Sequence, residues 1–118
     1  MNRDRGTVLD IVLACRDIET FIQGLDEVQF KVNRLVRSAT IHQILVIGEA
    51  TKRLSNEFRK KHRTIPWKTI AGMRDRLIHG YDQVDLDLVW YVATTEVPAL
   101  RAVLEPLVSD EEDGNTGE

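Results

Sequence analysis

The stretch VLDIVLACRDIETFI, residues 8–22, sets the fold class, because its apolar side chains recur every three or four residues. This spacing places them along one face of an α-helix. The stripe consists of Val8, Ile11, Val12, Cys15, Ile18 and Ile22. Gly24 and Asp26 are expected to end this helix, and residues 26–31 to form a loop. Apolar residues further along the chain show the same periodicity, which predicts an all-α protein.

A second helix is expected to begin near Val32 or Asn33 and to continue to about Arg59. It carries two apolar stripes. They run through Val36, Ile44, Ile47, Gly48, Thr51, Leu54 and Phe58, and through Leu35, Ala39, His42, Leu45, Val46 and Glu49. A helix that is apolar on two sides has to be covered on two sides. In a chain of 118 residues the second cover could be another copy of the protein, and the spacing alone leaves monomer and dimer open.

Pro66 indicates the start of a short third helix, with Thr64 as its N-cap and Ile78 or His79 as its last residue. Gly80 suits the left-handed position that follows a helix.

A fourth helix follows residues 82–85, and Pro98 is expected to kink it. Its apolar stripe consists of Leu88, Val89, Val92, Leu100, Val103, Leu104 and Leu107. The sequence therefore predicts an antiparallel, up-and-down bundle of about four main helices with short connections.

Charge is unevenly distributed. Residues 109–118 contain five acidic residues and no lysine or arginine, whereas the rest of the chain has 16 basic and 14 acidic residues. We expect a helical domain over residues 1–108 and a disordered acidic tail over residues 109–118. The body, with a net charge of +2, can bind a polyanion through local patches. One such cluster is RKKHR at residues 59–63, which either complements the negative end of a helix dipole or binds phosphate.

Cys15 is the single cysteine, which excludes an intramolecular disulfide and a cysteine-rich metal site. Its place in the apolar stripe indicates a small core residue. His42 and Glu49 share a helix face, but no motif supplies a third ligand, so no metal or other cofactor is predicted. The apolar runs are too short to span a bilayer and no signal peptide is recognisable, so we expect a cytoplasmic protein without a membrane partner.

The third helix carries a charge on its apolar side. On a helical wheel Arg74 falls within the stripe of Trp67, Ile70, Ala71 and Ile78. A guanidinium on an apolar face is costly unless it is paired or lines a groove. Two interpretations follow: an ion pair that braces two helices, with Glu49 as candidate partner, or a functional site.

His79 is expected in the last turn of the same helix, where the helix dipole favours its protonated form. Its alternative role is that of a polar helix cap. A histidine can transfer protons near neutral pH, and an arginine beside it can hold a phosphate. Arg74 and His79 together therefore favour acid–base chemistry on a phosphate ester.

The segment Arg74-Asp75-Arg76-Leu77-Ile78-His79-Gly80-Tyr81 resembles the signature of HEPN ribonucleases. An arginine followed by a polar residue and, after four intervening residues, by His-x-Tyr is similar to the HepT toxins of toxin–antitoxin pairs. Ile47-Gly48-Glu49-Ala50 and Ile65-Pro66-Trp67 also resemble that family. The likeness covers roughly residues 8–107.

The resemblance implies a homodimeric HEPN-like bundle that cleaves transfer RNA or messenger RNA without a metal ion. His79 would be the general acid or base and Arg74 would bind the scissile phosphate, both at the dimer interface. Asp75 would orient one of these two, and Glu49 would brace Arg74. RNA fits this chemistry, because the attacking group is the ribose 2′-hydroxyl.

The resemblance also implies a regulatory role for Tyr81. A cognate minimal nucleotidyltransferase, the antitoxin, would attach AMP to its hydroxyl, and the added phosphate would repel RNA. Without the resemblance, Tyr81 would be an aromatic residue packed on the helix end. The alternative function is a non-catalytic HEPN helical module that binds a nucleotide or a nucleotidyltransferase, and a third is a plain dimerisation domain.

Overall fold

The computed structural model describes the backbone of residues 2–81 and 83–116, and the side chains of residues 3–81 and 83–109. Within these residues the chain is helical, apart from turns and one isolated antiparallel bridge. The elements are α1 (Asn2–Ile22), α2 (Glu27–Val32), α3 (Arg34–Thr51), α4 (Asn56–Lys61), α5 (Trp67–Ala71), α6 (Met73–Leu77), α7 (Leu86–Tyr91), the π-helical turn η1 (Val92–Glu96) and α8 (Val97–Thr116). The predicted all-α fold class is confirmed.

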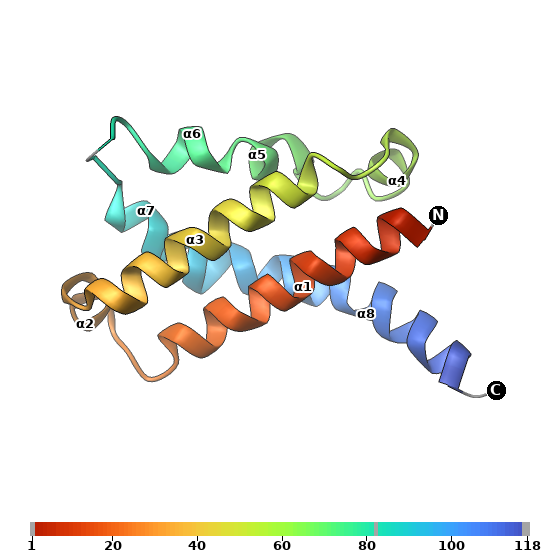
Figure 1. The fold of residues 1–118 in the computed structure, drawn as a ribbon, viewed down its shortest axis with the longest axis horizontal. Coiled ribbons are helices and arrows are strands. Elements are labelled where there is room, and N and C mark those ends of the chain that lie inside the picture. Colours follow the sequence, from red (N-terminus) through yellow and green to blue (C-terminus); the bar gives the residue numbers. More distant parts are fainter. Residues whose placement is uncertain (1, 82, 117–118) are drawn as a thin grey trace.

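The bundle has four main helical runs: α1, α3, the pair α5–α6, and the run α7–η1–α8. Helix α1 packs against both α3 and α8, and α5 and α6 pack against α3 (Figure 1). The short helices α4, α5 and α6 follow one another along one edge of the molecule in this view, next to α3. In the described part of the chain, no helix is both long enough and apolar enough to cross a lipid bilayer.

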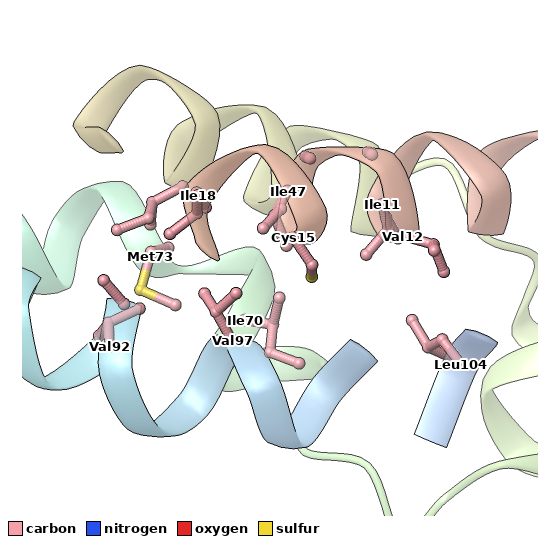
Figure 2. Packing of buried hydrophobic residues seen from close by; sticks show 14 of the residues in the cluster. Ile11, Val12, Cys15, Ile18, Ile47, Ile70, Met73, Val92, Val97 and Leu104 are labelled. Carbon is pink, nitrogen blue, oxygen red and sulfur yellow. The ribbon is translucent and has the colours of Figure 1, made fainter. Parts of the chain in front are cut away.

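The core lies between α1, α3, α5–α6 and the η1–α8 run. Figure 2 shows Ile18 and Cys15 of α1 facing Met73, Ile70 and Val97 from the other elements. Cys15 is fully buried, which confirms its interpretation as a small core residue. Burial among apolar side chains raises the pKa of its thiol to about 12, since the thiolate would lose its hydration.

The loop predicted for residues 26–31 is instead helix α2. Asp26 caps it: the Asp26 carboxylate accepts a hydrogen bond from the Gln29 amide at 2.8 Å, and the Gln29 side chain accepts one from the Asp26 amide. Phe30 anchors the helix, because its ring is buried and lies 5.2 Å from the ring of Trp90. A helix of six residues is too short to show an apolar periodicity, and the capping box that starts it is not visible in the apolar spacing.

Helix α3 ends at Thr51, well before the predicted end near Arg59. Ser55 starts a separate helix, α4, by accepting a hydrogen bond from the Phe58 amide at 3.1 Å. Asp4 of α1 holds this junction, since its carboxylate accepts from both the amide and the hydroxyl of Ser55. The prediction was wrong because the apolar spacing continues through the junction and masks the cap.

The single third helix predicted from Pro66 to Ile78 or His79 is two short helices, α5 and α6, separated by Gly72. Pro66 occupies the N-cap position that the sequence analysis assigns to Thr64, and no side chain caps this end. Glycine weakens a helix interior because it gains more freedom on leaving it than any other residue. The interruption changes which side chains face the core.

Gly48 allows α5 and α6 to approach α3 closely. A Cβ atom at this position would lie 3.1 Å from the carbonyl oxygen of Ile70 and 3.4 Å from Cβ of Met73. Any larger side chain would therefore push the α5–α6 pair away from α3. This explains a glycine in the middle of a helix, where it otherwise costs stability.

The perturbation expected at Pro98 takes the form of a π-helical turn. In η1 the Val97 amide donates to the Val92 carbonyl, five residues back, and Pro98 follows directly. Wide turns of this kind are often found next to functional sites. The turn leaves the run continuous, so α8 goes on from η1 and packs against α1.

Helix α8 extends to Thr116 and so includes most of the segment whose composition predicts disorder. The side chains from residue 110 onward, and residues 117–118 altogether, lie outside the described part of the chain. The acidic disordered tail over residues 109–118 stays a prediction.

Candidate active site

Arg74 lies on α6 and is exposed to solvent, not on the apolar face where the helical wheel places it. The break at Gly72 shifts the buried stripe to Trp67, Ile70, Met73 and Leu77. Among the described residues, the Arg74 side chain forms no hydrogen bond or ion pair. Its guanidinium is thus available to an anion from solution.

The bracing ion pair considered for Arg74 is formed by Arg76, two residues further along. Arg76 Nη1 and Nη2 donate to the two carboxylate oxygens of Glu96, at 3.0 and 2.9 Å. Both side chains are mostly buried, with 26% and 31% exposed. The hydrogen bonds to Glu96 raise the pKa of Arg76 further above its usual range. The two arginines of this five-residue helix therefore differ: Arg76 is ion-paired and mostly buried, whereas Arg74 is exposed.

His79 lies beyond the helix, not in its last turn. Helix α6 ends at Leu77, and Ile78 adopts an extended conformation and bridges to Val84. The helix-dipole argument for a protonated His79 therefore does not apply. The backbone of the residue is well fixed, since its amide donates to the Gln83 carbonyl at 2.8 Å. The imidazole is exposed and forms no hydrogen bond within the described residues.

A tight turn presents His79 and Tyr81 together. Gly80 has a φ of +142°, a conformation that side chains disfavour, and it accepts a hydrogen bond from the Gln83 amide at 3.3 Å. Gly80 therefore closes this turn. The role expected from the sequence, a residue that directly follows a helix, is not the one it has. Tyr81 is 99% exposed, so the packing of its ring on the helix end, expected without the resemblance, is wrong.

The backbone sets the spacing of Arg74 and His79. The Ile78 amide donates to the Arg74 carbonyl at 3.0 Å, so His79 begins just past one helical turn from Arg74. A helical turn rises about 5.4 Å. Both residues therefore belong to one short segment, with Arg74 in the helix and His79 directly after the extended Ile78.

The two supporting candidates are placed differently. Asp75 is exposed in the first turn of α6, beside Arg74 in the chain. The Glu49 carboxylate accepts a hydrogen bond from Lys52 at 2.9 Å, so the direct ion pair with Arg74 is not formed within one chain. The pKa of Glu49 is lowered, first by Lys52 and to a lesser extent by the charges of Arg53 and Arg74. Glu49 therefore shares a surface with Arg74 without binding it.

The Arg76–Glu96 pair is the part of the site that sequence reasoning missed. The two residues are 20 positions apart, on elements that the sequence does not place next to each other. The only local signal is a charged residue, Glu96, close to a proline in an apolar helix. Within the described residues, no three histidine, cysteine or carboxylate side chains converge in a way that could hold a metal ion.

Comparison with known proteins places the chain in a family. Residues 11–107 match the family described as Ribonuclease HepT-like. A "putative RNase" of Methanocaldococcus jannaschii is 38% identical over 109 residues, which cover 92% of this chain and 94% of that protein. A "probable ribonuclease HepT" of Thermococcus cleftensis is 36% identical over 98 residues, covering 83% and 89%. No solved structure matches significantly. With most of its length matched to the family and to these relatives, the chain belongs to the HepT-like ribonucleases.

Proposed function

We propose that the protein is a metal-independent endoribonuclease toxin whose catalytic groups are Arg74 and His79. The observation that carries this proposal is the contrast between Arg76 and the two residues Arg74 and His79, in α6 and the segment that follows it. Arg76 is neutralised by Glu96, whereas Arg74 and His79 are exposed, five residues apart, and form no side-chain hydrogen bond or ion pair within the described residues. An arginine and a histidine left free by a rigid segment are suited to a phosphate ester.

In the proposed reaction, the His79 imidazole removes the proton from a ribose 2′-hydroxyl. The 2′-oxygen attacks the adjacent phosphorus and the bond from phosphorus to the 5′-oxygen breaks. The products are a 2′,3′-cyclic phosphate and a 5′-hydroxyl, which takes its proton from a second imidazole. Arg74 offsets the charge that develops on the phosphate oxygens, and Asp75 orients one of the two groups.

A homodimer would supply the second imidazole, as His79 of another copy. The outer face of α3 supports this arrangement, because Leu35 is 79% exposed and Ala39, Leu45 and Val46 of the second apolar stripe are only partly buried. Beside this stripe, a groove of about 450 Å³ between α1 and α3 is lined by Leu13, Leu45 and Glu49 among others. In a dimer, Glu49 would be close enough to a site built from two chains to support it.

Cleavage of total transfer RNA and of a messenger RNA transcript in EDTA tests the nuclease. We expect fragments with 5′-hydroxyl ends, which polynucleotide kinase labels without prior phosphatase treatment. His79→Ala and Arg74→Ala should abolish cleavage, whereas His62→Ala and Arg34→Ala, which change residues of the same types elsewhere, should not. An unmodified dimer that leaves both RNAs intact would contradict the proposal and favour the non-catalytic module.

We also propose that a cognate minimal nucleotidyltransferase, an antitoxin present with its RNA target in the cytoplasm, transfers AMP from ATP to Tyr81. Almost complete exposure of the side chain, in the same turn as His79, supports this. The Tyr81 hydroxyl would attack the α-phosphorus of ATP, with loss of pyrophosphate. Incubation with the enzyme and ATP should add the mass of AMP to the wild type and to Tyr91→Phe, but not to Tyr81→Phe. Modification of Tyr81→Phe would rule this site out.

A further inference from the structure

Positive charge is concentrated in one part of the chain. Residues 52–74 contain eight lysine and arginine residues and a single acidic residue, Glu57, although the whole chain has a net charge of −3. These residues run from the C-cap of α3 through α4 and α5 to the start of α6. In Figure 1 the three short helices follow one another along one edge of the molecule and end at the candidate active site.

Of these eight cations Lys52 pairs with Glu49, and the other seven form no ion pair within the described residues. Several cations elsewhere form ion pairs: Arg101 with Glu19 and Glu105, Lys31 with Glu27 and Asp87, and Arg76 with Glu96. Within the described residues no ion pair is formed by Arg53, Lys60, Arg63 or Lys68, and all four are exposed. We call these four residues the basic surface.

Two members of the basic surface, Lys68 and Arg53, lie near Arg74. Lys68 lies on α5, which leads directly into α6, and α5 and α6 pack side by side on α3. Arg53 and Arg74 both act on the carboxylate of Glu49, which places them on the same side of α3. Arg59 of the neighbouring cluster is occupied differently, because its guanidinium donates to the Thr51 carbonyl at the end of α3.

The surface has the character of a nucleic-acid interface and not of a protein interface. Protein partners bind through a patch with an apolar centre. The exposed large apolar side chains of the described residues are Leu13, Val28, Val32, Leu35, Tyr81, Tyr91 and Val103. None of them lies within residues 52–74, and the apolar groove that residues 64–73 line together with η1 and α8 includes none of the four cations. Unpaired cations without an apolar centre fit a chain of phosphates, which binds by releasing its counterions.

We infer that the basic surface binds the RNA backbone that flanks the scissile phosphate, on the side of α5 and α4. This inference rests on the proposed nuclease and specifies how its substrate is held. Contacts to phosphate position an RNA without reading its bases. The surface therefore contributes affinity for RNA longer than a dinucleotide and does not select the sequence that is cut.

Two double variants with the same change in charge test the inference. Arg63→Gln/Lys68→Gln removes two cations from the basic surface, and Arg3→Gln/Arg34→Gln removes two exposed cations elsewhere. The probe is a fluorescent 30-nucleotide RNA with 2′-O-methyl groups, which cannot be cleaved, so that binding is measured by anisotropy in the otherwise unchanged protein. Titrations at several salt concentrations give the salt dependence of the affinity.

We expect the first variant to bind on the order of tenfold more weakly at 0.1 M salt, with the slope of log K against log salt reduced by about 1 to 1.5. The control should stay within about twofold of the wild type. Equal affinities and slopes for the two variants would overturn the inference, as would RNA binding that does not depend on salt.

Cleavage assays distinguish a failure of this inference from a failure of the proposed nuclease function. For long RNA the first variant should show a raised KM and an unchanged kcat, whereas a dinucleotide substrate should be cleaved as by the wild type. Altered cleavage of the dinucleotide would overturn the inference. If the wild type cleaves no RNA, the proposed function fails, and the binding comparison still decides whether this surface holds RNA.

Discussion

Arg76 of α6 and Glu96 of η1 form a bidentate ion pair that joins these two elements, with N–O distances of 3.0 and 2.9 Å. Helix α6 has five residues, too few to be stable through its own backbone hydrogen bonds. Its position depends on tertiary contacts, of which the ion pair is the only charged one among the described residues. The pair therefore fixes the segment that carries Arg74 and leads to His79.

Glu96→Gln should lower the free energy of unfolding by about 1–2 kcal/mol, because it leaves the mostly buried guanidinium of Arg76 without a charged partner. RNA cleavage should decrease as well, since α6 loses its anchor. Urea denaturation and a cleavage assay measure the two effects. Glu57→Gln, an exposed carboxylate on α4, is the control, with a change within about 0.5 kcal/mol. An equal effect of both substitutions would show that the pair does not hold α6.

Gly48→Ala should destabilise the protein by about 1–2 kcal/mol, although alanine is the better helix former. The new methyl group would press on the Ile70 carbonyl and displace α5 from α3. Gly6→Ala is the matched control, because Gly6 lies in α1 and a Cβ there meets no atom within 4 Å. The control should gain up to about 1 kcal/mol. Thermal or urea unfolding of both variants measures these opposite signs, and a stabilised Gly48→Ala would contradict the close approach.

Cys15 predicts a loss of stability at alkaline pH. Its pKa is about 12 in the folded protein and 9.0 for an ordinary thiol, so between these values the unfolded chain releases a proton that the folded chain keeps. The stabilising contribution is complete below pH 9 and decreases as the pH rises towards 12. Between pH 7 and 10, wild type should lose about 1.4 kcal/mol more than Cys15→Ala. Urea denaturation under reducing conditions measures this difference, and parallel losses would contradict it.

Asp26→Ala tests the helix that sequence analysis overlooked. The substitution removes the side-chain cap of α2, and we expect the free energy of unfolding to decrease by about 1 kcal/mol. Asp10→Ala, an exposed aspartate within α1, provides the comparison. Faster amide exchange at Gln29 and Phe30 in Asp26→Ala alone would locate the effect in α2. Identical exchange in both variants would indicate that packing of Phe30 suffices to form this helix.

The long elements are predictable from sequence because their stability comes from a periodic apolar face. The stripe that begins at Val8 specifies α1, and the stripe through Ile44 and Ile47 specifies most of α3. Elements of five or six residues are not predictable in this way, since packing and caps decide them. Asp26 and Ser55 are caps that begin such elements: Ser55 leaves the apolar spacing around it uninterrupted, and Asp26 is expected from sequence only to end the preceding helix.

The candidate site was likewise predictable only in part: the sequence identifies its residues but not their surroundings. The linear pattern of Arg74, His79 and Tyr81 identified the three residues, and their exposure follows only from the structure. A helical wheel drawn through Gly72 placed Arg74 on the wrong face, because it assumes an unbroken helix. The partner of Arg76 could not be predicted, since Glu96 reaches it through a π-helical turn that has no sequence periodicity of its own.

The turn that carries Tyr81 determines whether its hydroxyl can react in the folded protein or only after local unfolding. The side chain is 99% exposed while the backbone around it is held by the Ile78–Val84 bridge. A reagent or enzyme therefore meets the hydroxyl on the finished, folded molecule and does not wait for a local opening event. The rate of any reaction at Tyr81 should follow the concentration of the modifying agent and be insensitive to substitutions that alter fold stability.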